Sequence, residues 1–319
     1  MSDHPDVVCA GIVVADYVCT PVTHVPAAGE LVLAERILLT IGGCAANVAV
    51  DLSKMGVAAA VAGCVGGDPA GRVLTELLRE YRLDVASLKV CPGIDTSQTL
   101  IVNVAGEDRR FIHTFGANGQ FRAHDIPLDL ASPPRVLYLG GYLLMPGVLP
   151  EELAAVFAAA RRAGTRSVLD VVTPGPAEYL SRLAPLLPHV DVFLPNGDEA
   201  ALITGERDPV RQAEIFQRLG ADTVVITLGG DGAVLVSGRT RLRAPAYPVT
   251  FVDGSGGGDA FDAGYIFGLL QGMDATGCLR VASALGASCV RAVGTTTGVF
   301  SRAEYEAFIK QHPFRVEAL

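Results

Sequence analysis

The sequence contains little positive charge and no dense cluster of it. Its 319 residues include 25 Lys and Arg against 34 Asp and Glu, which gives a formal net charge of -9. Proteins that bind nucleic acid usually concentrate Lys and Arg on one face, so this composition argues against nucleic acid as a main partner. The N-terminus has no basic segment, and the apolar run Val7–Ala15 stops at Asp16, too early to cross a bilayer. We therefore expect a cytoplasmic protein with neither a secretion signal nor a membrane partner.

The cysteines do not form the pattern of a covalent or metal-bound framework. Their number is odd, seven, and no C-x-x-C pair is present, which argues against disulfides and zinc ribbons. Hydrophobic residues make up 50% of the chain, enough for a large core, so disorder is excluded. We interpret the cysteines as buried thiols in a reducing cytoplasm. They are Cys9, Cys19, Cys44, Cys64, Cys91, Cys278 and Cys289.

Strand-like and helix-like segments alternate along most of the chain. This alternation predicts a mainly parallel sheet covered by helices on both faces. The predicted strands are Val7–Val14, Ala58–Val65, Val136–Leu139, Ser167–Val172, Asp191–Leu194 and Thr223–Thr227, with a hairpin from Gly232–Val236 and Arg241–Arg243. The predicted helices are Ala45–Met55, Ala70–Tyr81, Glu151–Ala163, Pro176–Leu186, Val210–Leu219, Gly258–Leu270 and Ala275–Val293.

Four further strand-like segments do not fit this alternation. They are Tyr17–Val25, Leu31–Leu39, Thr99–Val104 and Arg109–Phe115, the last two joined by a hairpin-like link at Ala105–Asp108. We expect them to form a small sheet that projects from the body, with strands drawn from about 17–39 and 97–115.

Two common phosphate-binding motifs are missing. The chain has no GxxxxGK[ST], which excludes a Walker-type NTPase. It also has no G-x-G-x-x-G opening a helix after the first strand, which disfavours a dinucleotide-dependent enzyme.

A different glycine-rich segment, Val252–Phe261, leads from a strand-like stretch into an apolar helix. Its glycines let successive backbone N–H groups point at one place, and the helix N-terminus adds partial positive charge, so the segment suits an anion. Asp259 lies in the first turn beside this anion site. There it could take the proton of a hydroxyl that attacks phosphorus, or it could simply be an Asp that stabilises the helix dipole.

Four motifs, in order, resemble those of the ribokinase-like carbohydrate kinases, also called the PfkB family. Gly42-Gly43-Cys44-Ala45-Ala46-Asn47-Val48-Ala49 is similar to the first family signature, and Asp253–Phe261 to the second, usually written D-T-T-G-A-G-D-A-F. Pro195–Glu199 resembles the N-x-x-E motif, and Thr227–Gly232 the loop on the nucleotide side. The resemblance implies an α/β, ribokinase-like fold over residues 1–319 as a single kinase domain, with a mainly parallel central sheet flanked by helices and a small β lid.

The resemblance also implies roles for individual residues. Asp259 would be the base, and Asn196 and Glu199 would support Mg²⁺ and its waters near the phosphates. Without the resemblance, Asn196 and Glu199 are typical of a helix start with a capping box, and Asp16 is typical of a solvated strand end. The remaining implied assignments are Gly256, Gly257 and Gly258 to the anion hole, Asn196, Thr227, Gly229 and Gly232 to the ATP side, and Asp16, Gly42, Gly43 and Asn47 to substrate hydroxyls.

The second signature departs from the family pattern. Gly254-Ser255 replaces the usual Thr pair, and Gly257 replaces the usual Ala. In many relatives the region matching Asp253 and Ser255 holds a monovalent cation. Gly254 weakens the inference that K⁺ activates this chain, without excluding it.

We therefore predict an ATP- and Mg²⁺-dependent kinase that phosphorylates a hydroxymethyl group of a sugar or sugar-like polyol. Relatives act on ribose, fructose, keto-deoxy sugar acids, nucleosides and inositol. The predicted sugar region has no evident basic pair, which argues against a phosphorylated substrate, although Arg109 and Arg110 lie on the lid. His113 on a lid strand either contacts the sugar or is only a polar lid residue.

Two alternatives remain at this point, a nucleoside kinase of the same family and a non-catalytic relative that senses sugar. Asp259, the three glycines and Glu199 are all retained, which speaks against the second. An apolar lid face would favour burial between two chains, so we expect a homodimer joined through the lid.

Overall fold

A large sheet of ten strands runs through the computed structural model, which describes residues 4–107, 110–129 and 131–319. The strand order is β14-β13-β12-β11-β10-β9-β8-β1-β4-β5, parallel from β5 to β11 and antiparallel from there to β14. The strands are β1 Val7–Gly11, β4 Ala59–Gly66, β5 Leu88–Cys91, β8 Val136–Gly140, β9 Arg166–Leu169, β10 Val192–Phe193, β11 Thr223–Thr227, β12 Ala233–Ser237, β13 Thr240–Ala244 and β14 Glu317–Ala318.

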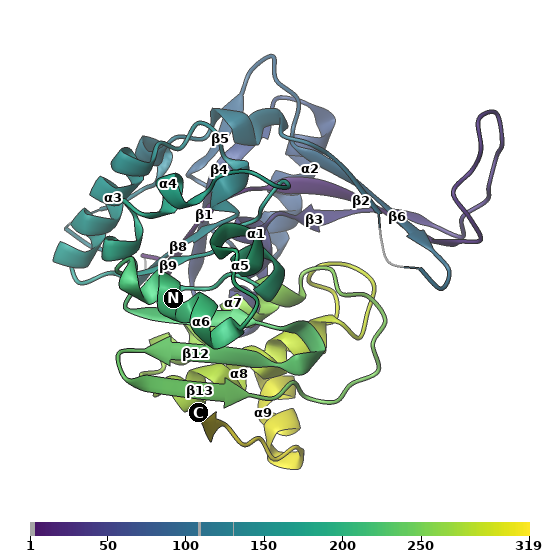
Figure 1. The fold of residues 1–319 in the computed structure, drawn as a ribbon. Helices are drawn as coiled ribbons and strands as arrows, with labels where there is room; N and C mark the ends of the chain where they lie inside the picture. The colour runs from purple at the N-terminus through teal and green to yellow at the C-terminus, as the bar shows by residue number, and fades with distance from the viewer. Residues whose placement is uncertain (1–3, 108–109, 130) are drawn as a thin grey trace.

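Helices flank this sheet, and α8 lies behind β12 and β13 in Figure 1. The helix α7 is buried along most of its length because it packs between α1 and α8, which explains why it reads as apolar all round. The helices are α1 Cys44–Lys54, α2 Pro69–Glu80, α3 Pro150–Arg162, α4 Leu180–Leu183, α5 Gly197–Thr204, α6 Pro209–Arg218, α7 Gly257–Leu270, α8 Ala275–Cys289 and α9 Arg302–Gln311. No helix within the described ranges is long and apolar enough to cross a membrane.

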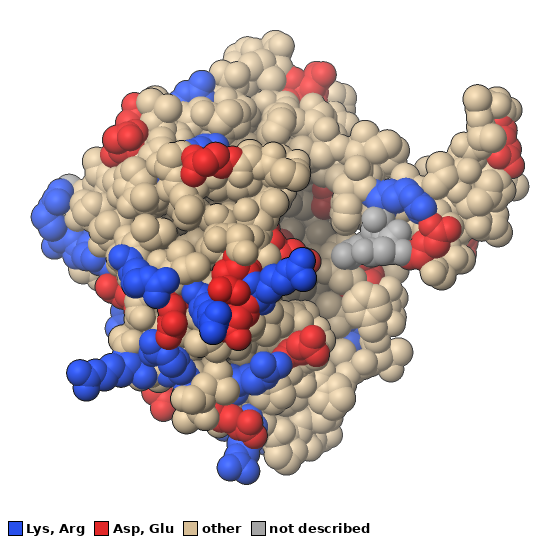
Figure 2. Space-filling model, viewed as in Figure 1, with Lys and Arg blue, Asp and Glu red and all other residues tan. Residues whose placement is uncertain are grey.

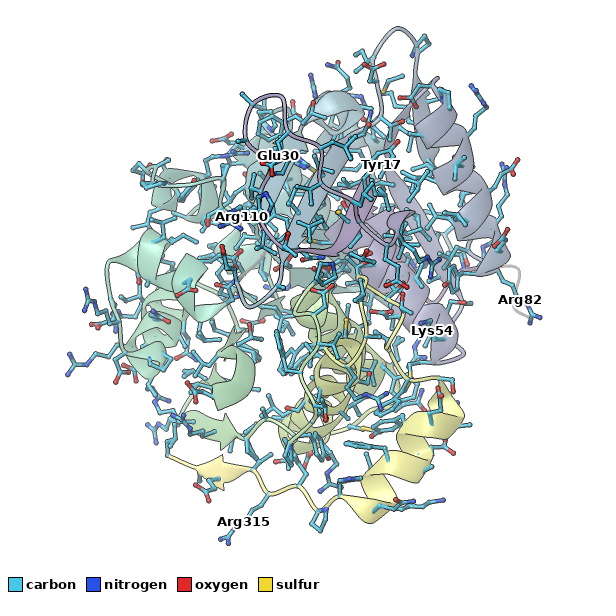
Figure 3. All side chains as sticks on the ribbon, turned by 90° about the vertical axis from the view of Figure 1, so that its right-hand side faces the viewer. Tyr17, Glu30, Lys54, Arg82, Arg110 and Arg315 are labelled. Atoms are coloured by element: carbon cyan, nitrogen blue, oxygen red, sulfur yellow. The ribbon has the colours of Figure 1, made fainter. Side chains whose placement is uncertain are left out.

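A separate sheet of four strands has the order β3-β2-β6-β7, as the interrupted alternation of the sequence predicted. Its strands are β2 Val14–Val22, β3 Ile37–Gly42, β6 Gln98–Val104 and β7 Arg110–Thr114. The loop 23–36 between β2 and β3, which we call the arm, extends away from the body at the right of Figure 1. Figure 3 looks onto this side and labels Tyr17, Glu30 and Arg110 there.

Two predicted elements were placed wrongly. The strand expected at Leu31–Leu39 begins only at Ile37, because β2 supplies pairing partners from there to Gly42, and Leu31 and Leu33 are exposed on the arm. The helix expected at Pro176–Leu186 is a single turn, α4. Pro185 has no N–H to donate to a carbonyl of the preceding turn, so a helix through it would lack a hydrogen bond. Asp108 and Arg109, which were assigned to the hairpin link and its second strand, lie outside the described residues.

Candidate active site

The sharp turn Gly256–Gly258, which we call the glycine turn, leads into α7. Gly256 is the N-cap and has a φ of 74°, a left-handed conformation that favours glycine. A Cβ at this position would also lie 2.1 Å from the carbonyl oxygen of Thr295, so the close approach of the two backbones requires glycine. The helix begins at Gly257 and places Asp259 in its first turn. The Gly257 N–H donates to the Gly254 carbonyl oxygen at 3.3 Å, and the positive end of the helix dipole lies beside the Asp259 carboxylate.

The Asp259 carboxylate is held by side chains from α1. The Asn47 amide Nδ2 donates to Asp259 Oδ2 at 2.8 Å, and the Cys44 sulfur lies within 4.8 Å of a carboxylate oxygen of Asp259. On the other side of the Asn47 amide, Oδ1 lies 3.0 Å from Thr295 Oγ1, whose single hydroxyl hydrogen goes either there or to the Ile41 carbonyl oxygen at 2.8 Å. Desolvation raises the pKa of Asp259, and the hydrogen bond from Asn47 and the neighbouring Cys44 thiol oppose that rise. Asn47, predicted to bind substrate hydroxyls, thus also contacts the predicted base.

More carboxylates surround Asp259 than the sequence predicted. Asp170 directly follows β9, Asp262 lies one turn after Asp259 on α7, and both are buried. Together with Cys44 and Glu199 they line a cavity of about 170 Å³, which we call the acidic cavity. None of the described residues that line it is Lys or Arg. Burial first, and then the neighbouring carboxylates, raise the pKa of Asp170 and of Asp262 well above the usual range.

The donors of the acidic cavity fit a divalent cation. One oxygen each of Asp170 and Asp259 and the sulfur of Cys44 lie within 4.8 Å of one another. Carboxylate oxygens are the ligands that Mg²⁺ prefers, and a bound cation would relieve the repulsion among these carboxylates.

Glu199 and Asn196 form the capping box that their spacing predicts. Asn196 Oδ1 accepts from the Glu199 N–H at 2.9 Å, and Glu199 Oε2 accepts from the Asn196 N–H at 3.0 Å. Glu199 also lines the acidic cavity, where burial and then the charge of Asp259, opposed by its bond from Asn196, raise its pKa to about 7. Glu199 therefore caps helix α5 and also lines the cavity where a carboxylate that supports Mg²⁺ was predicted.

A larger cavity of about 630 Å³ lies on the other side of the glycine turn. Asn196, Thr227 and Gly258 line both cavities, so the two adjoin each other. Asn196 and Thr227 come together because they follow or end the neighbouring strands β10 and β11 and form a parallel bridge. The other walls are mostly small or apolar, among them Gly229, Gly232, Ala246, Phe251, Phe261, Ala287 and Val290. An apolar flat group in this cavity could point attached phosphates at the glycine turn.

The predicted sugar-binding residues adjoin Asp259 from the opposite side. Asp16 lies buried on β2, and a Cβ at Gly42 would lie 2.0 Å from its carboxylate oxygen, so this glycine makes room for the carboxylate. Gly43 has a φ of 89° and is the N-cap of α1. Burial raises the pKa of Asp16 to about 7; a hydrogen bond from Thr99 lowers it and the charge of Asp259 raises it further. The two carboxylates therefore lie within electrostatic range of each other.

The loop predicted to hold a monovalent cation packs against residues 294–295. Asp253 Oδ1 accepts from the Ser255 N–H at 2.9 Å, and Asp253 Oδ2 accepts from the Gly294 N–H at 3.1 Å. The Cys289 thiol donates to the Ser255 carbonyl oxygen at 3.2 Å. These bonds fix the loop directly before the glycine turn.

Sequence reasoning missed Cys44, Asp170 and Asp262 as site residues. Two signals were available. Asp170 follows a parallel strand, where ligands of α/β sheets collect, and Asp262 is three residues from Asp259 on the same helix. Cys44 carried no separate signal, because a thiol between a glycine and an alanine at a helix start is typical of a buried core residue.

A glycine-rich helix start, a carboxylate in its first turn and an adjoining cavity lined by carboxylates are typical of enzymes that transfer phosphoryl groups. The family model described as "pfkB family carbohydrate kinase" matches residues 4–301. The ribokinase of Haemophilus influenzae is 27% identical over 306 residues, covering 94% of this chain and 97% of that protein. The aminoimidazole riboside kinase of Salmonella typhimurium is 30% identical over 288 residues, covering 85% and 88%.

A solved structure of a putative ribokinase II from E. coli, in complex with ATP and Mg²⁺, shares the fold with a TM-score of 0.82. It is 22% identical and covers 97% of this chain and 100% of its own. The chain belongs to the pfkB family of carbohydrate kinases. It is a phosphotransferase that acts on a hydroxyl group of a sugar.

Proposed function

We propose that the enzyme transfers the γ-phosphoryl group of ATP to a hydroxymethyl group of a sugar-type substrate, with Mg²⁺. The observation that carries this proposal is the position of Asp259, between the glycine turn, the acidic cavity and Asp16. The large cavity beside the glycine turn suits the nucleoside part of ATP. The relatives named ribokinase and the fold neighbour that holds ATP and Mg²⁺ support the same assignment.

The chemistry follows from where each group lies. The substrate hydroxyl oxygen attacks the γ-phosphorus, its proton passes to an Asp259 oxygen, and the bond from phosphorus to the leaving oxygen of ADP breaks. The N–H groups of the glycine turn stabilise the charge on the transferring group. Asn47 holds the carboxylate in place by the hydrogen bond described above.

Magnesium supplies charge neutralisation of the phosphates when it is bound. Glu199 and Asn196, through waters, and Asp170 are the residues that would hold it. For K⁺ we propose the loop around Asp253 and Ser255, because it adjoins the glycine turn and is fixed against Gly294.

We further propose that the protein is a cytoplasmic homodimer joined through the small sheet. All seven cysteines are free, as suits a reducing compartment. The face of the small sheet that carries Leu39, Leu100 and Ile112 leaves these side chains exposed, and the arm is mainly uncharged in Figure 2. Light scattering should give twice the chain mass, and Ile112→Glu should shift it to a monomer; a parent protein that is monomeric at high concentration would contradict the dimer.

The proposed activity is tested by release of ADP from Mg–ATP with a panel of sugars and nucleosides. We expect turnover with at least one acceptor that has a hydroxymethyl group, and transfer of labelled γ-phosphate to that acceptor. Release of the label only as inorganic phosphate, or no release with any acceptor, would contradict the proposal.

A further inference from the structure

We propose that Lys54 is a positioning residue for phosphoryl transfer. Its ammonium group fixes residues 294–299, which we call the 294–299 loop, and this loop in turn holds Asn47 and the glycine turn. Asn47 contacts the proposed base, and the glycine turn lies beside the proposed phosphate site. The inference rests on the proposed function, because Lys54 acts only through groups that serve that reaction.

Lys54 lies in the last turn of α1 and contacts Thr296, which is 242 positions away in the sequence. Its Nζ donates to the carbonyl oxygen of Thr296 and, at 3.5 Å, to that of Val299. The Val299 N–H donates to the same Thr296 carbonyl oxygen at 3.2 Å, so the ammonium group contacts both ends of a turn within the loop. Figure 3 labels Lys54 beside the yellow C-terminal part of the chain. Hydrogen bonds from a charged donor are stronger than those between neutral groups.

The 294–299 loop consists of bends and turns rather than a helix or a strand. Its first residue, Gly294, has a φ of 104°, a left-handed conformation that favours glycine. Thr295, Thr296 and Val299 are nevertheless buried. Buried backbone groups that lack the partners of a helix or sheet must be satisfied by other groups. The position of this loop therefore depends on side chains, and the ammonium group of Lys54 satisfies two of its carbonyl oxygens.

The 294–299 loop contacts three parts of the candidate site. The Gly294 N–H donates to Asp253 Oδ2 at 3.1 Å, directly before the glycine turn. The Thr295 carbonyl oxygen lies 2.1 Å from the place that a Cβ on the first glycine of that turn would occupy. Thr295 Oγ1 lies 3.0 Å from Asn47 Oδ1, and Asn47 Nδ2 donates to Asp259. A displaced loop would therefore move the proposed base and the glycine turn together.

Helix α1 contacts the 294–299 loop at two positions, Asn47 and Lys54. The two residues are seven positions apart, so they lie two turns apart on the same face of the helix, at a spacing of roughly 10 Å. The stretch Cys44–Leu52 between the start of α1 and its last turn is buried. A helix packed into a dense core keeps such a spacing constant. Lys54 therefore fixes the loop relative to the Asn47 amide that contacts Asp259.

Asp51 lies between Asn47 and Lys54 on the same face of α1. It is fully buried, and neither of its carboxylate oxygens accepts a hydrogen bond from the residues that the structure describes. Burial raises the pKa of Asp51 well above its usual range, and the nearby charge of Lys54 opposes that rise. Because the Asp51 carboxylate makes no hydrogen bond to the loop, it balances the charge of Lys54 without holding the loop. The two residues therefore allow stability and positioning to be measured separately.

Lys54→Met keeps the length of the side chain and removes its donors. With Mg–ATP and an acceptor identified by the panel above, kcat should fall about tenfold, because the base and the glycine turn lose their fixed geometry. KM for the acceptor should stay within about twofold of the parent, since Asp16 and Gly42 are not displaced. Lys54→Arg can donate to the same carbonyl oxygens and should restore most of the rate.

The Asp51 variants separate positioning from stability. Asp51→Asn alone is the matched control and should leave kcat unchanged. Lys54→Met leaves a buried carboxylate without a countercharge and should lower the thermal unfolding midpoint, whereas the double variant with Asp51→Asn should regain the midpoint and keep the low kcat. Rates are compared well below each midpoint. A kcat that returns to the parent value in the double variant would show that Lys54 acts only on stability and would overturn the inference.

A second double variant tests the route from Lys54 to the base. If Lys54 acts through the Asn47 amide, the loss of kcat in Lys54→Met combined with Thr295→Val should stay well below the product of the two single losses. A combined loss equal to that product would overturn this route.

The failures of the inference and of the proposed function are distinguishable. A parent protein that turns over, with a Lys54→Met variant within about twofold of its kcat, would overturn this inference and leave the kinase activity standing. No ADP release by the parent with any acceptor would overturn the proposed function and this inference with it. If Lys54→Met does not fold, the double variant with Asp51→Asn carries the same comparison, and a kcat equal to that of the parent would overturn the inference.

Discussion

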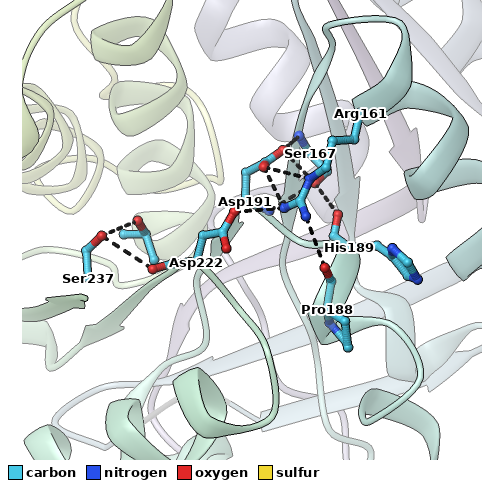
Figure 4. Close-up of polar contacts among 8 residues, drawn as sticks. Arg161, Ser167, Pro188, His189, Asp191, Asp222 and Ser237 are labelled. Atoms are coloured by element: carbon cyan, nitrogen blue, oxygen red, sulfur yellow. Dashed lines mark hydrogen bonds and ion pairs between the residues drawn. The ribbon is translucent and has the colours of Figure 1, made fainter.

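Acidic residues lie at both ends of strands β9, β10 and β11, but within the part of the chain that the structure describes only those at the amino ends are paired with a basic side chain. At the amino ends, Asp191 and Asp222 share the guanidinium group of Arg161, whose Nη2 donates to them at 2.7 and 2.8 Å (Figure 4). The second oxygen of Asp191 accepts from the Ser167 N–H at 2.7 Å. At the carboxyl ends, Asp170, Asp262 and Glu199 line the acidic cavity with Asp259, and no Lys or Arg among the described residues joins them.

This difference indicates that the acidic residues at the amino ends stabilise the fold, whereas those at the carboxyl ends serve ligand binding. An Asp bonded to an Arg and to a backbone N–H contributes to stability in the protein as it stands. Buried carboxylates placed close together cost stability, and proteins keep such groups where function requires them. The carboxyl ends of parallel strands are also where ligands of α/β sheets bind.

Asp259→Asn should have the largest effect, because it removes the proposed base and keeps its shape. We expect kcat to fall at least about 100-fold, the lower end for a general base. Affinities for sugar and nucleotide, measured by calorimetry, should survive, since Asp16 and the glycine turn are unchanged. Turnover within a few-fold of the parent would show that Asp259 is not the base.

Glu199→Gln should raise the Mg²⁺ concentration needed for half-maximal rate by about 10- to 100-fold, as for other residues that orient a metal through water. The Gln side chain can still accept the cap bond from the Asn196 N–H, so helix α5 should remain. Asp198→Asn, a change of charge at the neighbouring position, is the matched control. An unchanged Mg²⁺ dependence in the Glu199 variant would show that Glu199 does not support the metal.

Thr295→Val should lower kcat by about tenfold, because the Asn47 amide that contacts Asp259 loses the hydroxyl that lies 3.0 Å from its oxygen. Thr295→Ser keeps the hydroxyl and should restore the rate. The pH profile of kcat should shift in the Val variant alone, since a bond to the base changes. Thr296→Val, at a buried neighbour whose carbonyl oxygen accepts from Lys54, should leave that profile unaltered.

Asp191→Asn tests the other end of the strands. The loss of charge opposite Arg161 should lower the free energy of unfolding by about 1–2 kcal/mol, since the pair is partly exposed. Urea unfolding measures this, and kcat at saturating substrate should not change. A large loss of kcat at unchanged stability would contradict the assignment of Asp191 to stability rather than to catalysis.

The sequence allowed most of the large sheet to be predicted, because β1 and β4 are continuous buried runs and α2 and α6 have one apolar face. The arm was less predictable. Leu31 and Leu33 have the alternation of a strand, but none of the described strands pairs with them. Pairing depends on a segment distant in sequence, which local patterns do not reveal.

The candidate site could be predicted where its residues form a continuous motif. Asp259 and the glycine turn are one such segment, and Asn196 and Glu199 another. Asp170 lies alone in an otherwise apolar stretch, so its place in the cavity became visible only when the strand order was known. The hydrogen bond from Thr295 to Asn47 joins residues 248 positions apart, and neither carries a local signal of the contact.

In this account, a cation and the phosphates of the nucleotide bind together at the acidic cavity and the glycine turn. The most direct test is the thermal unfolding midpoint of the parent protein with Mg–ATP, with ATP and a chelator, and with neither. Ligand at about 100 times its Kd should raise the midpoint by a few degrees, through about 2.7 kcal/mol of linkage. We predict this rise with Mg–ATP and a much smaller one with ATP and chelator. An equal rise with and without the metal, or no rise with Mg–ATP, would contradict the account.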